Sequence, residues 1–275
     1  MAKTKSNKAD KDVKRGPEAF TRYYEGVWGE RWIKLKASLQ QPSAKVSLPS
    51  PFSDTRSLPY ELDPASLMPA AALQVKPGNR VLDMCSAPGG KALAMIFSVE
   101  GEAKFVLNDL SKQRLSRLNR VLKEQLPESV LSQVRTTHFD SSRWGMYEPE
   151  AFDRVLLDAP CSGEQHLLSR PAELAQWSLK RTKYLAQRQY ALLCAGVQVL
   201  KPGGRLVYST CTISPLENDQ VISKYLKKKP NTVTVERVGS ECGEPTEHGW
   251  IILPDQCQGQ GPIYFSVLQK VPIEK

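Results

Sequence analysis

The stretch Phe152-Asp-Arg-Val-Leu-Leu-Asp-Ala-Pro-Cys-Ser-Gly163 decides how this sequence is interpreted. Residues 152–157 form an apolar run with the length and composition of a buried strand. The loop that follows carries the Asp158 carboxylate and the Cys161 thiol. Because ligands of open α/β sheets bind outside the carboxyl ends of the strands, we expect a ligand beside this loop.

A second cysteine follows another predicted strand. Residues 204–209, Gly-Arg-Leu-Val-Tyr-Ser, predict that strand, and Cys211 stands two positions after its end. Two thiols at two strand ends indicate sulfur chemistry beside a bound cofactor.

The composition is that of a soluble globular protein with a basic balance. The chain has 275 residues, enough for one large domain or one domain with an extension, and 38 basic against 29 acidic residues give a net charge of +9. This balance favours a nucleic acid or another polyanion as partner, although charge alone also fits a basic protein without one. No apolar run reaches the roughly 18 residues of a membrane span, so we expect no membrane association.

The six cysteines and three histidines do not form a recognisable structural framework. The sequence has no C-x-x-C pair and its histidines are scattered, so we expect neither a zinc site nor a disulfide scaffold. A reducing intracellular compartment with free thiols is the default expectation.

Three segments are expected along the chain. Residues 1–16 are lysine-rich and predict a disordered basic tail, and residues 17–60 predict a helical extension, broken near Gly29, followed by a proline-rich linker. The aromatic residues of the extension either face RNA or, as is more usual at helical spacing, pack onto the main domain. Residues 61–275 form that main domain.

Strands and helices alternate through the main domain. Helices are predicted at 91–97, 111–126 and 173–200, and strands at 80–83, 103–108, 134–138, 152–157 and 205–209. This alternation predicts an α/β fold of Rossmann-like type, with a mostly parallel sheet covered by helices on both faces. The runs 232–236 and 263–267 are expected to add strands at one edge.

A glycine-containing loop follows the first of these strands. In Asp83-Met-Cys-Ser-Ala-Pro-Gly-Gly-Lys91, paired glycines allow a ligand to approach the backbone, and the next helix offers free N–H groups. The loop matches neither the dinucleotide fingerprint nor the Walker loop.

Acidic residues follow the neighbouring strands. Asp109 can accept hydrogen bonds from both ribose hydroxyls or cap the next helix, and Asp140 can accept one from an adenine amine. Together with Asp83 and Asp158 they would line one rim. That much negative charge disfavours a phosphate cofactor and favours a cationic sulfonium, which indicates S-adenosylmethionine.

Methylation of carbon 5 of cytosine requires the groups found here. A thiolate adds to carbon 6 to make carbon 5 nucleophilic, an acid beside nitrogen 3 offsets developing charge, and a further group manages departure of the thiol. Cys211, Asp158 and Cys161 can supply these three functions. The remaining cysteines have no such setting: Cys194 lies in an apolar helix, and no motif surrounds Cys242 or Cys257.

Residues 83–91, 158–163 and 201–211 resemble, in order and spacing, the motifs of the NOL1/NOP2/Sun (RsmB/NOP) family. The resemblance implies a class I S-adenosylmethionine-dependent RNA cytosine-5 methyltransferase, with Cys211 as nucleophile and Cys161 promoting product release. It further implies a cofactor site made of Cys85, Ser86, Ala87, Pro88, Gly89, Gly90, Lys91, Asp109, Arg114, Asp140, Ser141 and Asp158.

The chain departs from the commoner family pattern where substrate is chosen. Residues 164–170 stand where many members have an Arg-Arg pair, while residues 24–32 and 261–265 resemble the compact branch that includes mitochondrial enzymes. We expect RNA as substrate, with rRNA preferred over tRNA; a non-catalytic RNA-binding protein and a DNA methyltransferase are the alternatives.

A monomer is expected, with a possible partner protein delivering the RNA. The expected compartment is the cytoplasm, with the mitochondrion as alternative, because Asp10 and Asp12 fit an organelle presequence poorly.

Overall fold

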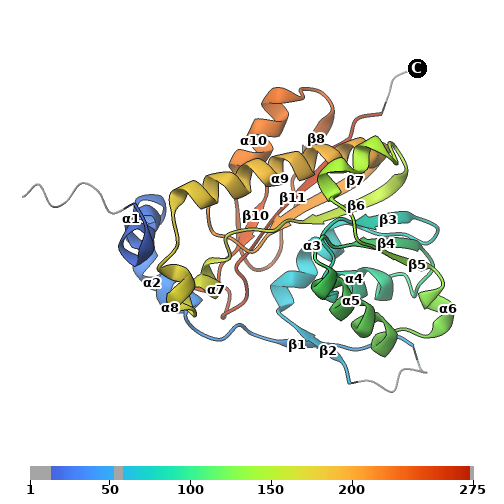
Figure 1. Ribbon diagram of the computed structural model, residues 1–275, viewed down its shortest axis with the longest axis horizontal. Helices are drawn as coiled ribbons and strands as arrows, with labels where there is room; N and C mark the ends of the chain where they lie inside the picture. Colours follow the sequence, from blue (N-terminus) through green and yellow to red (C-terminus); the bar gives the residue numbers. More distant parts are fainter. Residues whose placement is uncertain (1–13, 53–57, 273–275) are drawn as a thin grey trace, which may run out of the picture.

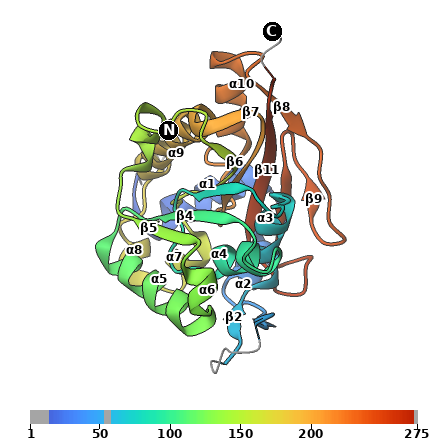
Figure 2. The ribbon, with the colours of Figure 1, turned by 90° about the vertical axis from the view of Figure 1, so that its right-hand side faces the viewer.

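The computed structural model describes residues 14–52 and 58–272. Its centre is a mixed sheet whose strand order is β5-β4-β3-β6-β7-β11-β10-β9, with β8 paired to β11 (Figures 1 and 2). The parallel strands are β3 (Arg80–Asp83), β4 (Lys104–Asn108), β5 (Val134–Thr137), β6 (Phe152–Asp158) and β7 (Leu200–Thr210). The antiparallel edge is made of β8 (Val233–Glu236), β9 (Glu244–Pro245), β10 (Trp250–Ile252) and β11 (Ile263–Lys270). The predicted α/β class and the predicted extra edge strands are confirmed.

Helices cover both faces of this sheet (Figure 1). One face carries α3 (Leu67–Ala72), α4 (Gly90–Phe97) and α5 (Lys112–Gln125), and the other carries α9 (Leu179–Val199) and α10 (Asp219–Lys228). Successive residues of a strand point to opposite faces, so Val81 packs with the α3–α5 layer and Leu82 with the α9 layer. Burial on both faces explains why these strands are near-continuous apolar runs.

The order of the parallel strands reverses between β3 and β6. β3 pairs with β4 on one side and with β6 on the other, and the loops after all five parallel strands emerge at one edge of the sheet. Ligands bind at such a switch point in open α/β sheets. Short helices lie along the loops and linkers: η2 (Pro64–Ser66), α6 (Glu128–Leu131), η3 (Ser141–Met146), α7 (Glu164–Leu168) and α8 (Pro171–Leu174).

The helix predicted over 173–200 is wrong at its amino-terminal end. The chain forms α8, leaves the helical path at residues 175–178, and begins α9 at Leu179. Trp177 lies at the break, and its buried ring packs edge-on against Phe20 at a centroid distance of 5.5 Å. Its carbonyl oxygen also accepts a hydrogen bond of 2.9 Å from the Gly16 N–H.

The amino-terminal extension packs onto the main domain. Its two helices, α1 (Gly16–Trp28) and α2 (Arg31–Leu39), are separated at Gly29 as predicted. Their aromatic side chains Phe20, Tyr24 and Trp32 are almost fully buried in the core on the α9 side of the sheet. The packing interpretation is therefore confirmed for these rings, and the RNA-facing one is wrong.

The proline-rich segment is only partly an extended linker. It contributes β1 (Val46–Leu48), which pairs antiparallel with β2 (Tyr60–Leu62). Most of the predicted tail, residues 1–13, and linker residues 53–57 lie outside the described residues.

Two of the cysteines expected to be free form a disulfide. Cys242 and Cys257 are joined, with their Cα atoms 5.8 Å apart, because the loops on either side of the β9–β10 hairpin lie together. Within the described part of the chain, none of the helices has both the length and the apolar character needed to cross a bilayer.

Candidate active site

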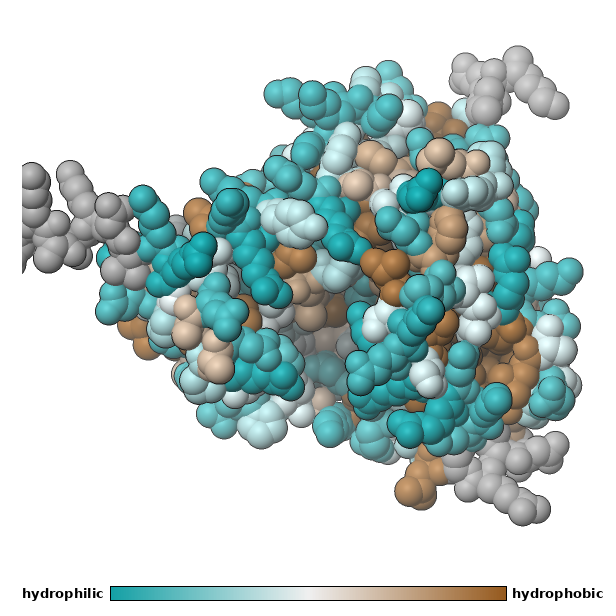
Figure 3. Space-filling model, viewed as in Figure 1, coloured by the Kyte–Doolittle hydropathy of each residue, from teal (hydrophilic) through white to brown (hydrophobic). Residues whose placement is uncertain are grey.

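A cavity of about 680 Å³ opens at the carboxyl edge of the sheet, beside α9. Figure 3 shows this face of the molecule hollowed near its centre. The predicted site residues that line the cavity are Cys85, Asp109, Arg114, Asp140, Ser141, Asp158, Cys161 and Cys211. A smaller cavity of about 120 Å³ shares Cys85 and Asp158 and is lined by the rest of the glycine loop except Met84 and Gly89. The structure thus brings residues from four strand ends and one loop to a single place.

The glycine loop is held in shape by α5. Gly89 has a φ of +119°, and a Cβ at this position would lie 2.9 Å from Leu118 Cδ1. Only glycine fits there, because the conformation is left-handed and the space is filled. Gly90 begins α4, so the free amides of that helix face the loop. Arg114 donates a hydrogen bond to the Ala87 carbonyl oxygen and so attaches α5 to the loop.

Asn108 fixes the strand ends that surround the loop, a role that sequence reasoning missed. Its amide nitrogen donates to the carbonyl oxygens of Met84 and Phe139 at 3.2 and 2.9 Å and to Ser141 Oγ at 2.8 Å. Ser141 Oγ in turn donates to the Met84 carbonyl oxygen at 2.7 Å. The polar side chain of Ser141, predicted to bind the cofactor, is therefore used in the scaffold of the cavity.

Asp109 presents an unsatisfied acceptor. Its Oδ1 accepts a hydrogen bond of 2.8 Å from the Ser111 N–H, while its buried Oδ2 has no hydrogen-bond partner. The nearest cation, Arg114, lies 3.5 Å from that oxygen. The hydroxyl of Ser111 caps α5, so the cap expected as an alternative role for Asp109 is supplied by its neighbour. Because buried acceptors are rarely left unpaired, this oxygen indicates a missing donor such as a ribose hydroxyl.

The two other acids near the loop differ in setting. Asp140 Oδ1 accepts from the N–H and the hydroxyl of Ser142 at 3.1 and 2.8 Å, which fixes its side chain at the cavity wall. Asp83 is buried and contacts the smaller cavity only. Burial, and secondly the charge of Asp158, raises the pKa of Asp83 to about 7.

The residues present fit an adenosyl sulfonium cofactor. The large cavity combines an unpaired buried acceptor at Asp109, further carboxylates at Asp140 and Asp158, and a glycine loop with free helix amides beside it. Carboxylates attract a cation and would repel a polyphosphate.

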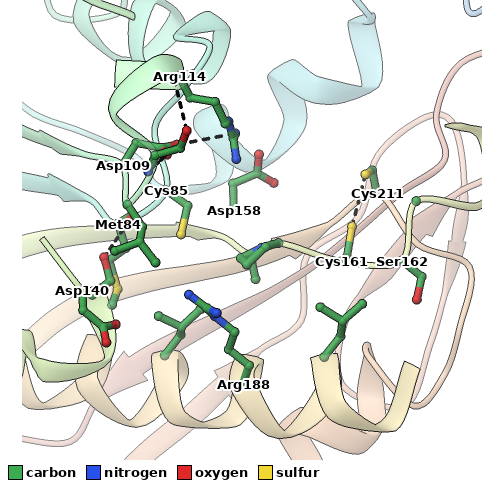
Figure 4. A pocket seen from close by; sticks show the side chains of 18 of the residues that line it. Met84, Cys85, Asp109, Arg114, Asp140, Asp158, Cys161, Ser162, Arg188 and Cys211 are labelled. Carbon is green, nitrogen blue, oxygen red and sulfur yellow. Dashed lines mark hydrogen bonds and ion pairs between the residues drawn. The ribbon is translucent and has the colours of Figure 1, made fainter. Parts of the chain in front are cut away.

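The two predicted catalytic thiols meet at the other end of the cavity. Cys161 Sγ and Cys211 Sγ lie 3.2 Å apart (Figure 4). Cys211 is exposed to the cavity, and Cys161 is more enclosed. The hydrogen bond with Cys211, followed by burial and by the charges of Cys211, Glu217 and Glu164, raises the pKa of Cys161 well above its usual value. This shift favours the protonated form of Cys161.

The other free cysteines are held as thiols. Burial, with the charges of Asp83, Asp158 and Asp109, raises the pKa of Cys85. Burial raises the pKa of Cys194 as well. Neither is suited to nucleophilic attack, because the reactive form is the thiolate.

Asp158 lies between the two ends of the cavity and is paired with a lysine. Lys91 Nζ donates to Asp158 Oδ2 at 2.8 Å, and Ser209 Oγ donates to Oδ1 at 2.8 Å. Burial lowers the pKa of Lys91. The ion pair and hydrogen bond with Asp158, followed by the charge of Cys211, raise it by more than burial lowers it, so the net shift is upward. Lys91, predicted as part of the cofactor loop, therefore places a lasting positive charge near Asp158 and Cys211.

Two residues of α9 at the cavity were missed by sequence reasoning. Tyr184 and Arg188 both line the cavity, and Arg188 rises from α9 between the acids and the thiols (Figure 4). Within the described residues, the Arg188 guanidinium makes no hydrogen bond or ion pair. Their spacing of four residues puts them on one face of a helix, a signal that was available in the sequence.

Comparison with known proteins places the chain in a family. A family profile described as 16S rRNA methyltransferase RsmB/F matches residues 70–269. Mouse 5-cytosine rRNA methyltransferase NSUN4 is 36% identical over 230 residues, which cover 78% of this chain and 60% of that protein. The chain belongs to the RsmB/F methyltransferase family. The mouse mitochondrial tRNA (cytosine(34)-C(5))-methyltransferase is 33% identical over 81% of the chain and 67% of its own length.

Two solved structures share the fold of this chain. NSun6 from Pyrococcus horikoshii, crystallised with SFG, an S-adenosylmethionine analogue, matches with a TM-score of 0.78 and 18% identity over 94% of this chain and all of that one. A methyltransferase homolog protein from the same organism matches with a TM-score of 0.74 and 26% identity over 93% and 95% of the two chains. The predicted Rossmann-like methyltransferase fold is confirmed. The chain spans about three fifths of the length of NSUN4.

Proposed function

We propose that this RsmB/F family member is an S-adenosylmethionine-dependent RNA cytosine-5 methyltransferase. The observation that carries the proposal is the contact of 3.2 Å between the Cys161 and Cys211 sulfur atoms, at the opposite end of one cavity from Asp109 and Asp140. A methyltransferase that needs no covalent intermediate has no use for such a pair of thiols. S-adenosylmethionine bound at the acidic end supplies an electrophilic methyl group.

The nucleophile in this proposal is Cys211. Its thiolate adds to carbon 6 of a cytosine, so that the electron pair of the C5–C6 double bond moves to carbon 5 and the ring nitrogen 3 gains negative charge. The Lys91 ammonium, which is held by its ion pair with Asp158, offsets the negative charge that develops during addition. A cytosine must leave its stack to reach this depth, so the substrate is an unstacked or looped-out nucleotide.

Release of the product uses Cys161. The proton leaves carbon 5, its electron pair restores the C5–C6 double bond, and the bond between carbon 6 and Cys211 Sγ breaks with its electrons on sulfur. The raised pKa of Cys161 keeps it protonated beside the departing sulfur. Cys161 passes its proton to the Cys211 sulfur as the carbon–sulfur bond breaks and takes up the carbon 5 proton in the same event, so that it ends as a thiol. One proton passes to solvent when Cys211 ionises again.

We further propose rRNA as the preferred substrate. The description of the family profile and the names of NSUN4 and of an Aeromonas salmonicida relative, ribosomal RNA small subunit methyltransferase F, refer to rRNA. A tRNA is the second candidate, favoured by the relative named as a mitochondrial tRNA enzyme. Bisulfite sequencing of cellular RNA with and without the gene separates the two.

The compartment and the assembly belong to the same proposal. We expect a cytoplasmic monomer, with the mitochondrion as the alternative that the mitochondrial tRNA relative supports, and a partner protein that delivers the RNA. Fluorescent tagging tests the compartment, while gel filtration and affinity capture test the assembly.

The test of the activity uses S-adenosylmethionine labelled in its methyl group and total RNA from cells lacking the gene. We expect label in 5-methylcytosine, released by ribonuclease and not by deoxyribonuclease. Cys211→Ala is expected to abolish transfer, and Cys161→Ala to hold RNA in an adduct that dissociates slowly. Binding without transfer by the intact protein would mean an RNA-binding protein instead, and label in DNA would mean a DNA methyltransferase.

A further inference from the structure

Two buried glutamates lie behind the thiols and have no part in the chemistry proposed above. Glu164 and Glu217 are both fully buried, and neither lines the cavity. Burying a carboxylate is costly unless its oxygens accept hydrogen bonds. Each glutamate accepts hydrogen bonds from residues of a loop that carries one of the two cysteines.

Glu164 is bonded to the loop that carries Cys211. Its Oε1 accepts from the Thr212 hydroxyl at 2.9 Å, and its Oε2 accepts from the Ile213 N–H at 2.9 Å. The Tyr24 hydroxyl of α1 donates to Oε1 at 2.5 Å. The two residues that follow Cys211 are thus fixed by one carboxylate, which in turn is fixed by the amino-terminal extension.

Glu217 is bonded to the loop that carries Cys161. It accepts from the Ser162 N–H at 3.0 Å, from the Ser162 hydroxyl, and from Gln189 Nε2 at 2.8 Å. The same Gln189 nitrogen donates to the Pro160 carbonyl oxygen at 2.9 Å. The residues on both sides of Cys161 are therefore held by Glu217 and the α9 residue bonded to it.

We propose that Glu164 and Glu217 are separate positioning residues for the two halves of the reaction. Glu164 fixes Cys211 for addition to carbon 6, and Glu217 fixes Cys161 for the proton transfers of release. The inference rests on the proposed function, because it assigns a step to each loop. It also gives the α1 extension a role, since Tyr24 donates to the carboxylate that holds the nucleophile loop.

The two steps are read with two RNA probes. RNA containing 5-azacytidine reports addition, because its adduct with Cys211 forms but has no carbon 5 proton to lose. Unsubstituted total RNA from cells lacking the gene reports release, because its adduct accumulates in the presence of S-adenosylmethionine only when release is slow. Adducts are counted as denaturant-resistant protein–RNA bands, with unfolding temperature measured for every variant.

The matched variants are Glu164→Gln and Glu217→Gln in the full chain. Small misplacements of reacting groups cost up to about 100-fold in rate, so we expect changes of about 10-fold or more. Glu217→Gln should form the 5-azacytidine adduct at the normal rate but accumulate adduct with unsubstituted RNA, as Cys161→Ala does. Glu164→Gln should slow formation of the 5-azacytidine adduct and accumulate none.

Ser162→Ala keeps the inference testable if Glu217→Gln does not fold. It removes one hydroxyl donor to Glu217 and should accumulate adduct to a smaller extent. Two results would overturn the inference while leaving the proposed function standing. One is that both glutamate variants affect both probes equally. The other is that folded Glu217→Gln and Ser162→Ala accumulate no adduct with unsubstituted RNA. A wild-type protein that forms no adduct with 5-azacytidine RNA would overturn the proposed function itself.

Discussion

Asp109 carries the clearest single-residue signal for a ligand. Its Oδ2 is buried without a hydrogen-bond partner, although the chain satisfies the other oxygen at 2.8 Å. A ligand hydroxyl would repair this deficit. An amide at the same place offers one acceptor fewer and carries no charge, which removes the attraction for a sulfonium.

Asp109→Asn is therefore expected to weaken binding of S-adenosylmethionine by about 10-fold or more, since a lost hydrogen bond to a charged group costs about 1.5–3 kcal/mol. Isothermal titration calorimetry measures it. Asp153→Asn, which makes the same chemical change at the start of β6 and lines neither of the two cavities, is the control. Equal affinities for wild type and Asp109→Asn would remove Asp109 from the cofactor site.

Single positions were predictable where the chemistry is local to a strand end. Asp109, Asp158, Cys161 and Cys211 each follow an apolar run, and the parallel arrangement alone brings such positions to one edge. Lys91 shows the limit of this reasoning. Its place in the glycine loop was foreseen, but its ion pair with Asp158 depends on how β3 and β6 sit side by side.

Helix α9 is the element that forms one wall of the cavity. Tyr184, Arg188 and Leu192 follow one another at four-residue intervals on it, and all three line the cavity. Arg188 carries a charge that no described residue pairs with, in a cavity that also holds Asp140 and Asp158. A guanidinium in this setting is suited to a phosphate oxygen of the incoming nucleotide.

Arg188→Ala should weaken RNA binding by about 10-fold and lower the slope of log affinity against log salt by about 1, as loss of one phosphate contact does. Filter binding at several salt concentrations measures both quantities. Lys228→Ala on α10 removes the same charge away from the cavity and should change neither. An unchanged salt slope in Arg188→Ala would show that this side chain does not contact phosphate.

The beginning of α9 shows why the boundaries of helices could not be predicted from the sequence. Helical spacing predicted a helix from residue 173, but Trp177 is drawn into a core built by Phe20 and Tyr23 of α1. These partners lie more than 150 residues away in sequence, so no local pattern contains them. A separation of 140 residues likewise hides the hydrogen bond of Tyr24 to Glu164, on which our positioning inference depends.

The folded molecule buries carboxyl groups, and burial disfavours their charged form. Burial, together with the neighbouring charge of Glu164, raises the pKa of Glu217 from 4.5 to about 7, despite opposing hydrogen bonds from Ser162 and Gln189. Asp83 is raised from 3.8 to about 7. Between the unfolded and folded values the native state holds protons that the unfolded chain has released, so the free energy of unfolding falls as pH rises through this window.

Glu217→Gln should remove the part of this pH dependence that comes from Glu217. The part that comes from Asp83 should remain in the variant. We expect the wild type to lose stability faster than the variant by up to about 1.4 kcal/mol per pH unit between about pH 5 and about pH 7. Urea unfolding across that range measures it. Parallel stability curves for the two proteins would mean that Glu217 titrates alike in the folded and unfolded states.

The central claim is that Cys211, rather than Cys161, bonds to the pyrimidine. The most direct measurement is to capture the wild-type protein on RNA containing 5-azacytidine, digest both, and identify by mass spectrometry the peptide that carries the nucleotide. The account predicts the nucleotide on the sulfur of Cys211, in wild type and in Cys161→Ala alike. A nucleotide attached to Cys161, or capture that persists in Cys211→Ala, would contradict it.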